Sequence, residues 1–389
     1  MSSWEKLPQT ETNQKKRIDA RTMLAIYYLN MNIYLQAREA VEPILDLALA
    51  LNYRKRLPAI YTVIGGSYLW VEEDSRKGLE FTNKAIKVAE EVADHLSLAA
   101  ALLDSGAHLP FISEFKDAHK RLKQSLDLSL LANSQRGIAF SEGCISMCYI
   151  MEGKMNPAHE FAQETLRLAQ ETGDVWIKGM AYSFYIASCY FKGLFEEAKA
   201  HFFEYTSLYE KSASISSTGW AYAPMGAMHI DLGEFDDAVN CYKKIIPIMK
   251  SGRYMPSMIK YLQSCLIRAK ALRNDQDIEV SELFTCYQNY KVMWCQGWTA
   301  RNIGDVLLHI DNDHLADAEK WFQKAIEADT NNAMRWELAK DHANYANWFK
   351  KKGDMQGAKD QLIKAIDIFK ECGADGWVTR TEKTLAELS

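Results

Sequence analysis

The sequence has few helix-breaking residues and no long apolar run. Only 8 of the 389 residues are proline and 20 are glycine, too few for a loop-rich all-β chain or a disordered one. No apolar stretch approaches the roughly 20 residues that span a bilayer, and the longest candidate, residues 41–51, contains Glu42, Pro43 and Asp46. Residues 1–14 are polar and lack the apolar core of a signal peptide. We therefore expect no contact with a membrane.

The charge and the cysteine pattern exclude two further classes. A net charge of −5 and an isoelectric point near 6.0 argue against a dedicated nucleic-acid binder. The eight cysteines form no CxxC pair and mostly stand among apolar residues, which predicts free core thiols in a reducing, cytoplasmic compartment. Cys144 and Cys148 share a helix face, but no further Cys or His nearby completes a zinc set. We expect neither a metal nor another cofactor.

A short motif recurs along the chain with a period of roughly 40 residues, which lies in the range of helical repeat families. Residues 233–245 read GEFDDAVNCYKKI: a glycine, an aromatic residue, two acids and an alanine, followed by apolar positions at helical spacing. Related segments follow one another at nearly equal steps, and one double step leaves room for a further unit. The small residues that mark this frame are Ala37, Gly78, Ala118, Ala158, Ala198, Ala238, Ala318 and Ala358.

A second small residue stands twelve positions before most of these marks. Gly304 precedes its mark by fourteen positions because Asn312 and Asp313 lengthen the turn. Apolar residues spaced at three and four surround both positions, which predicts two amphipathic helices per unit that cross closely at the small residues. Since one helix pair cannot bury its apolar face alone, the units must stack. The second set is Ala25, Gly66, Gly106, Ser146, Gly226 and Ala346.

These patterns predict an all-α chain folded as a right-handed superhelical solenoid of about nine helix–turn–helix units. We expect a polar segment over residues 1–17, the repeats over 18–372 and a capping helix over 373–389. The seventh unit, centred on Ile278, lacks the small residues. Poor packing there would allow a bend or hinge, and an ordinary divergent repeat is the alternative. The units are marked near residues 37, 78, 118, 158, 198, 238, 278, 318 and 358.

The Gly-x-Phe-x-x-Ala core and its period resemble the tetratricopeptide repeat in its longer variety. Residues 16–21 and segments within 318–377 also resemble the C-terminal repeat region of bacterial class III adenylate/guanylate cyclase–ATPase signalling proteins. The resemblance implies a regulatory or partner-sensing module in signalling. It carries over no catalytic residue, because the sequence contains neither the cyclase nor the ATPase part.

The residues themselves offer no catalytic constellation. The phosphate-binding pattern GxxxxGK[ST] and the zinc-protease pattern HExxH are absent, and the nine histidines are scattered. Acid pairs such as Glu196–Glu197 stand at helix starts, where they complement the helix dipole. We therefore expect the chain not to be an enzyme.

In a stacked array the first helix of each unit lines one concave face. Counting back from the marks places apolar and aromatic residues in the middle of this face and more polar and basic residues later. Because Trp, Tyr, Met and Arg supply binding hot spots, we predict a groove that holds a peptide. Phe140, Tyr190 and Trp220 would be apolar anchors, and Arg301 and Lys340 would bind carboxylates. The predicted groove residues are Phe140, Met147, Met180, Tyr190, Trp220, Lys260, Trp298, Arg301, Lys340 and Asn347.

Two interpretations of this face stay open. The aromatic residues would either contact a partner or only fill the interior of the superhelix. The favoured function is a non-enzymatic scaffold for a protein or peptide partner. The alternative is a sensor that binds a small molecule and regulates a cyclase or ATPase portion in cis or in trans. Nothing in the sequence indicates nucleic-acid binding or homo-oligomerisation, although self-association is compatible with the scaffold.

Overall fold

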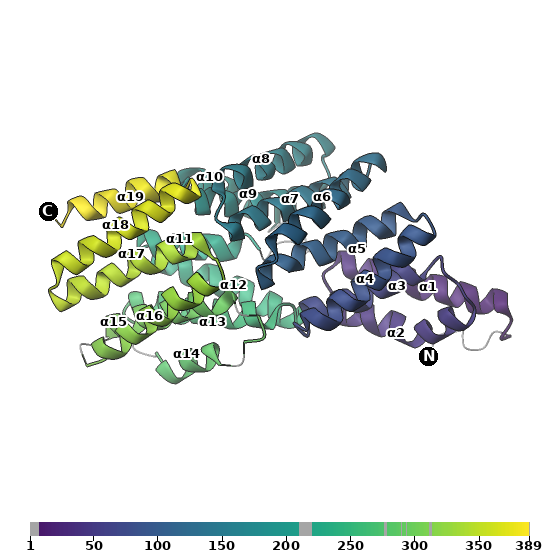
Figure 1. The fold of residues 1–389 in the computed structure, drawn as a ribbon, viewed down its shortest axis with the longest axis horizontal. Helices are drawn as coiled ribbons and strands as arrows, with labels where there is room; N and C mark the ends of the chain where they lie inside the picture. The colour runs from purple at the N-terminus through teal and green to yellow at the C-terminus, as the bar shows by residue number, and fades with distance from the viewer. Residues whose placement is uncertain are drawn as a thin grey trace. The chain divides into compact units, whose positions relative to one another are not determined.

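The computed structural model describes residues 8–209, 220–275, 278–288, 290–292, 294–310 and 313–388. These residues form nineteen α-helices and a short 3₁₀ turn, with no strand among them (Figure 1). The predicted all-α class is therefore confirmed. No described helix combines the length and the apolar character that a membrane crossing requires.

The helices belong to two compact units, each of which is described by itself. The first unit contains residues 8–109, 116–141 and 249–256, and the second contains 110–115, 142–248 and 257–388. The helices wholly or mostly in the first unit are α1 (Glu11–Asn30), α2 (Tyr34–Ala50), α3 (Leu57–Trp70), α4 (Ser75–Glu91), α5 (His95–His108) and α6 (Phe115–Leu131).

The second unit holds most of α7 and all later helices, apart from the junction of α12 with α13. Within the unit, neighbouring helices pack as successive antiparallel pairs (Figure 1). Its helices are α7 (Gln135–Glu152), α8 (Met155–Thr172), α9 (Val175–Lys192), α10 (Phe195–Tyr209), α11 (Tyr222–Leu232), α12 (Phe235–Gly252), α13 (Pro256–Leu272), α14 (Val280–Tyr287), α15 (Trp294–Ile310), α16 (Leu315–Asn331), α17 (Arg335–Lys352), α18 (Met355–Cys372) and α19 (Asp375–Ala386).

Helix ends follow local capping chemistry. Thr10 accepts a hydrogen bond from the Asn13 backbone N–H, so α1 begins at Glu11, inside the segment expected to be a polar tail. Asp174 accepts from two backbone N–H groups in the first turn of α9. At the other end of α9, Gly193 adopts φ +86°, a left-handed conformation that favours glycine. These signals define where the helices turn.

The small residues that mark the repeat lie where helices cross. All eight are buried, and Ala37, Ala118 and Ala318 are fully inaccessible. A Cβ atom on Gly78 would lie 2.3 Å from Leu69 Cδ2, so α3 and α4 approach too closely for a larger side chain. The sequence marks therefore correspond to helix contacts. The count of nine units and the right-handed superhelix stay predictions.

The first unit has an apolar core that the junction of α12 and α13 completes. Ile18, Val41 and Ile60 are fully buried in this core. The Tyr254 ring stacks on Tyr34 and on Trp70, with centroid distances of 5.5 and 5.8 Å. The Met255 N–H donates to the Trp70 carbonyl oxygen at 2.7 Å. A segment from much later in the chain is thus part of this unit.

In the second unit, the divergent seventh repeat keeps its helix pair. α13 is a full-length helix, whereas α14 contains only eight residues. Ile278 packs against an apolar cluster that includes Leu283 and Ile303. The expected capping helix is α19, whose Trp377 is buried and donates through Nε1 to the Tyr190 carbonyl oxygen at 2.8 Å. That bond joins residues on α9 and α19 within the unit.

Candidate binding site

Helices of the second unit bury a network of charged side chains. Arg301 on α15 donates to Asp341 Oδ1 at 2.8 Å and to Glu337 Oε2 at 2.5 Å, both on α17. The side chains of Arg301, Glu337 and Asp341 are 6, 8 and 0% exposed. Burial opposes the charge on Arg301, but Glu337 and Asp341 raise the pKa of its guanidinium well above the usual value. The pair of helices is therefore joined by a buried, fully ionised guanidinium.

A second buried pair connects α17 with α11. Lys340 Nζ donates to Asp231 Oδ1 at 2.6 Å, and the Tyr190 hydroxyl donates to Asp231 Oδ2 at 2.9 Å. The Lys340 ammonium also lies 4.1 Å from the centroid of the Trp377 ring. Burial lowers the pKa of Lys340 to about 8, an effect that Asp231 opposes. Asp231 on α11 and Trp377 on α19 therefore hold this ammonium in place, and Tyr190 on α9 holds the Asp231 carboxylate.

One buried carboxyl group has no donor of its own. Neither oxygen of Asp329, on α16, has a hydrogen-bond partner if the group is ionised. Burial raises its pKa well above the usual value, and the nearby Asp341 and Glu337 carboxyls raise it further. A Cβ atom on Gly297 would lie 2.1 Å from Asp329 Oδ1, so this glycine makes the space for the carboxyl group. Its surroundings therefore favour the neutral form of the Asp329 carboxyl group.

Arg268 and Asp305 extend the network toward solvent. Arg268 Nε donates to Asp305 Oδ2 at 2.7 Å, which joins α13 to α15. Arg268 Nη1 also donates to Asn302 Oδ1 at 3.5 Å, and Asn302 in turn donates to the Ser264 hydroxyl oxygen at 2.9 Å. The interior network comprises Asp231, Arg268, Arg301, Asp305, Asp329, Glu337, Lys340 and Asp341.

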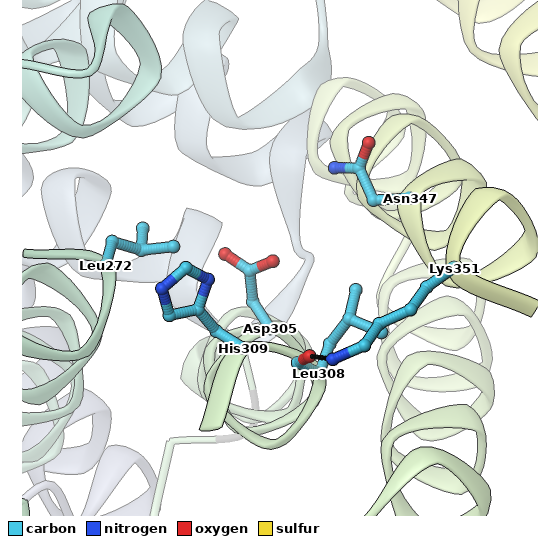
Figure 2. A pocket seen from close by; sticks show the side chains of 6 residues that line it. All are labelled: Leu272, Asp305, Leu308, His309, Asn347 and Lys351. Atoms are coloured by element: carbon cyan, nitrogen blue, oxygen red, sulfur yellow. Dashed lines mark hydrogen bonds between the residues drawn. The ribbon is translucent and has the colours of Figure 1, made fainter. Parts of the chain in front are cut away.

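A pocket of about 310 Å³ opens beside the Asp305 end of this network. It is lined by residues near the ends of α13, α15 and α17 (Figure 2). Figure 2 shows the Asp305 carboxylate between the His309 ring and the Asn347 amide, while Lys351 reaches the Leu308 carbonyl oxygen. The lining residues are Leu272, Asp305, Leu308, His309, Asn347 and Lys351.

The polar groups of this pocket differ in how far they are already engaged. Asp305 is paired with Arg268, and His309 Nε2 lies 3.1 Å from Asn274 Oδ1. The Asn347 side chain is exposed, and an amide of this kind offers both donors and an acceptor. Together with Leu272 and Leu308, these groups give a small pocket with apolar walls and a few polar contacts, as binding sites have.

The structure distributes the predicted groove residues between interior and surface. Phe140 belongs to the first unit and the other nine to the second. Arg301 and Lys340 do bind carboxylates, but those of this chain. Their binding of a partner therefore stays a prediction, as it does for the whole set. Buried are Met180, Tyr190, Trp298, Arg301 and Lys340; half-buried are Phe140, Met147, Trp220 and Lys260; exposed is Asn347.

Three acids that pair with the predicted cations were not expected at this face: Asp231, Glu337 and Asp341. A partial signal for one of them exists in the sequence. Asp341 lies 40 positions after Arg301, on the next first helix, and is offset by two positions within its helix because the turn after Gly304 is longer. Opposite charges about one repeat period apart therefore indicate a contact between units.

The solved structures that resemble the chain are helical repeat proteins. A Rap protein complexed with Competence and Sporulation Factor aligns with a TM-score of 0.53 at 14% identity, over 99% of this chain and 90% of that one. Yeast Tom70 aligns with a TM-score of 0.43 at 12% identity, over 96% and 85%. A STAND signal-transduction ATPase with a tetratricopeptide repeat sensor from Pyrococcus horikoshii gives 0.44 at 11% identity, over 94% of this chain and 55% of that chain.

The fold is a tetratricopeptide-like helical repeat solenoid. No family model matches the chain, and the comparison with curated proteins gives no match. At these identities the resemblance shows the fold alone. In this solenoid the pocket lies on the first-helix side, because α13, α15 and α17 are the first helices of successive pairs.

The described residues contain one group with the composition of a metal site. Ligand atoms of His229, Glu234 and Asp237 lie within 4.8 Å of one another. Glu234 already pairs with Lys199 Nζ at 2.6 Å and with His229 Nδ1 at 2.6 Å, and both partners lower its pKa. These contacts account for the cluster as a connection between α10, α11 and the turn before α12. The eight cysteines are free and buried, as predicted.

Proposed function

We propose that the chain is a non-enzymatic interaction scaffold that binds a peptide segment of a protein partner on the first-helix side of its second unit. The observation that carries the proposal is the pocket between the ends of α13, α15 and α17. Its Asn347 is an exposed member of the predicted groove set, beside residues whose charges are already paired. A peptide backbone presents donors and acceptors together, and the Asn347 amide complements both.

The buried network supports this role by fixing the helices that form the pocket. Arg268 joins α13 to α15, and Arg301 joins α15 to α17. Because each joint is buried and charge-assisted, the three helix ends stay in register. A preformed site loses less conformational entropy on binding than a flexible one does. Apart from Asp329, the acids and bases of this network pair with one another, which suits a structural role better than a catalytic one.

The test uses selected peptides, because the partner is not identified. A phage-displayed library of random linear peptides is panned against the immobilised full chain, and enriched peptides are measured by isothermal titration calorimetry. We expect Asn347→Ala to weaken binding at least about tenfold, which is about 1.4 kcal/mol. Asn30→Ala, an exposed asparagine of the first unit, is the matched control and should change nothing. Absence of enrichment, or peptides indifferent to Asn347, would contradict the proposal.

A second candidate is a sensor for a small molecule, favoured by the volume of the pocket. About 310 Å³ lies at the lower end of the range for small-molecule sites. Its coupling to a nucleotide cyclase or ATPase is supported only by the sequence resemblance over residues 16–21 and 318–377. Thermal shifts with a metabolite panel, lost in Asn347→Ala, would favour this function over the scaffold.

A further inference from the structure

The first helix of the chain carries an apolar stripe on its exposed side. We name it the N-terminal stripe: Ala20, Met23, Leu24, Tyr27 and Met31. All five residues are exposed, with 61% of Tyr27 and 57% of Met23 accessible. The opposite face of α1, with Ile18, Thr22 and Ala25, is buried in the unit. An exposed apolar helix face of this kind is a candidate contact surface.

The other end of the array does have a polar surface. α19 buries Trp377 and Thr381 against the second unit. Its exposed positions include Thr379, Arg380 and Glu382, all polar. The exposed side of α1 is thus apolar, whereas the exposed side of α19 is polar. An apolar patch on one end only permits closed pairs rather than an open-ended filament.

We propose that two copies of this chain form a dimer in which the N-terminal stripes pack against each other as antiparallel helices. The spacing of the stripe supports helix pairing. Ala20, Leu24, Tyr27 and Met31 follow one another at four, three and four positions, which is the spacing of a helix-packing seam. A two-fold axis crossing α1 between Leu24 and Tyr27 sets each Leu24 against the second copy's Tyr27. It also sets the small Ala20 against the long Met31.

Charge selects the antiparallel direction. Lys15, Lys16 and Arg17 stand in the second turn of α1, where Lys15 also pairs with Glu11 at 2.6 Å, and the last turn of the helix has no basic residue. Parallel helices would bring the two basic segments together, and like charges at short range oppose association. In the antiparallel pair the basic segments lie at opposite ends of a helix of 20 residues, separated by roughly 30 Å.

The exposed area is sufficient for such a dimer. Met23, Leu24, Tyr27 and Met31 are 57, 45, 61 and 37% exposed. At roughly 200 Å² for a large side chain, this is roughly 400 Å² of mostly apolar surface per copy. Two copies supply roughly 800 Å², and since interfaces are about 57% apolar, the whole contact is roughly 1,400 Å². Specific stable interfaces begin at about 1,200 Å².

The experiment measures oligomeric state on the full chain. Sedimentation velocity over a range from low to high micromolar concentration should show a monomer–dimer equilibrium. The double variant Leu24→Ser/Tyr27→Ser should raise the dissociation constant at least about a hundredfold. The matched control is Leu131→Ser/Val175→Ser, which changes two residues that are 85 and 54% exposed elsewhere and should leave the dimer intact. Circular dichroism verifies that both variants keep their helix content.

Disulfide trapping then tests the orientation. The eight native cysteines are buried, so an added surface cysteine reacts alone. A mixture of Leu24→Cys and Tyr27→Cys proteins should cross-link faster than either protein by itself, because antiparallel packing brings these two positions together. A chain that stays monomeric, or a serine double variant that dimerises like the wild type, overturns the dimer. Cross-linking of Leu24→Cys mainly with itself overturns the antiparallel arrangement.

Discussion

Both units bury a carboxyl group against a glycine in a helix, but they surround it differently. In the first unit, a Cβ atom on Gly66 would lie 2.6 Å from Asp104 Oδ2. In the second unit, a Cβ atom on Gly297 would lie 2.1 Å from Asp329 Oδ1. Trp70 Nε1 donates to Asp104 Oδ1 at 2.6 Å, a neutral donor, whereas Asp329 lies among other carboxyls and Arg301. In both units a helix glycine thus leaves room for a buried carboxyl group. That group is isolated from other charges in the first unit and belongs to an ionic network in the second.

The two interiors balance their buried charge in different ways. The interior network of the second unit has three cations and five carboxyl groups, so two negative charges would remain if all were ionised. Burial raises the pKa of Asp329, Asp341 and Glu337, which favours the protonated, neutral forms of these groups over an excess of negative charge. In the first unit, burial alone raises the pKa of Asp104 to about 7, against hydrogen bonds from Trp70 and Tyr34. One interior depends on ion pairs and the other on packing.

The largest expected effect comes from removing the central cation. Arg301→Met leaves Glu337 and Asp341 buried without their partner, and we expect a loss of about 3–5 kcal/mol in unfolding free energy. The control in the first unit is Arg56→Met, which breaks the 2.6 Å pair with Asp19. Those side chains are 24 and 36% exposed, so the expected loss is at most about 1 kcal/mol.

Urea unfolding combined with hydrogen exchange assigns each loss to its unit, because the two units need not unfold together. Equal losses from Arg301→Met and Arg56→Met would contradict the view that the second interior depends on ionic contacts.

A smaller effect is expected from filling the two glycine sites. Gly297→Ala places a methyl group 2.1 Å from Asp329 Oδ1, and Gly66→Ala places one 2.6 Å from Asp104 Oδ2. We expect each change to cost about 1–3 kcal/mol, with the larger loss at Gly297, where the displaced carboxyl disturbs Asp341 as well. Thermal unfolding measures both. Adding Asp329→Ala should rescue Gly297→Ala, and absence of rescue would assign the loss to another contact.

The sequence predicts where the helices cross better than it predicts which side chains contact one another. The small residues at positions such as Ala118 and Ala318 repeat with the period, so the helix crossings follow from spacing alone. Contacts between distant segments cannot be predicted in this way. Tyr254 packs on Tyr34 and Trp70, which stand far earlier in the chain, and no local pattern encodes that contact. Asp231 and Lys340 are likewise 109 positions apart, which is no multiple of the repeat.

In the candidate site, too, some residues could be predicted from the repeat and others could not. Asn347, assigned to the groove from its position on a first helix, lines the pocket, and its contact with a partner stays a prediction. Leu272 and Lys351 line it as well, but they stand near the ends of their helices, where small shifts in turn length decide which side chains face each other. Arg301 looks in sequence like a ligand for a partner's carboxylate. Only the fold shows that Glu337 and Asp341 already occupy it.

The pH dependence of stability should distinguish the isolated Asp104 from the ionic network around Asp329. A carboxyl group whose folded-state pKa is raised stabilises the protein below its unfolded pKa, and this stability is lost as the pH rises through the folded value. For Asp104 the window runs from its ordinary 3.8 to about 7. Asp104→Asn should reduce the fall in stability there by up to about 1.4 kcal/mol per pH unit.

Asp329→Asn should remove a fall that extends further toward alkaline pH, since the neighbouring carboxyls raise the Asp329 pKa in addition to burial. Urea midpoints measured from pH 4 to pH 9 distinguish the two variants. Identical profiles for Asp104→Asn and Asp329→Asn would show that burial alone determines the pKa of both carboxyl groups.

The smallest effect is expected when both partners of a buried pair lose their charge. Lys340→Met alone leaves the Asp231 carboxylate with only the Tyr190 hydroxyl, and we expect a loss of about 3 kcal/mol. In Lys340→Met/Asp231→Asn the neutral amide oxygen still accepts from Tyr190, and the methionine keeps most of the packing on Trp377. Most of the loss should then be recovered, to within about 1 kcal/mol of the wild type, since a buried ion pair contributes little net stability. Urea unfolding of the three proteins measures the coupling. A double variant as unstable as Lys340→Met would show that the charges themselves hold α11 and α17 together, and that the second unit differs from the first in its source of stability and not only in its arrangement.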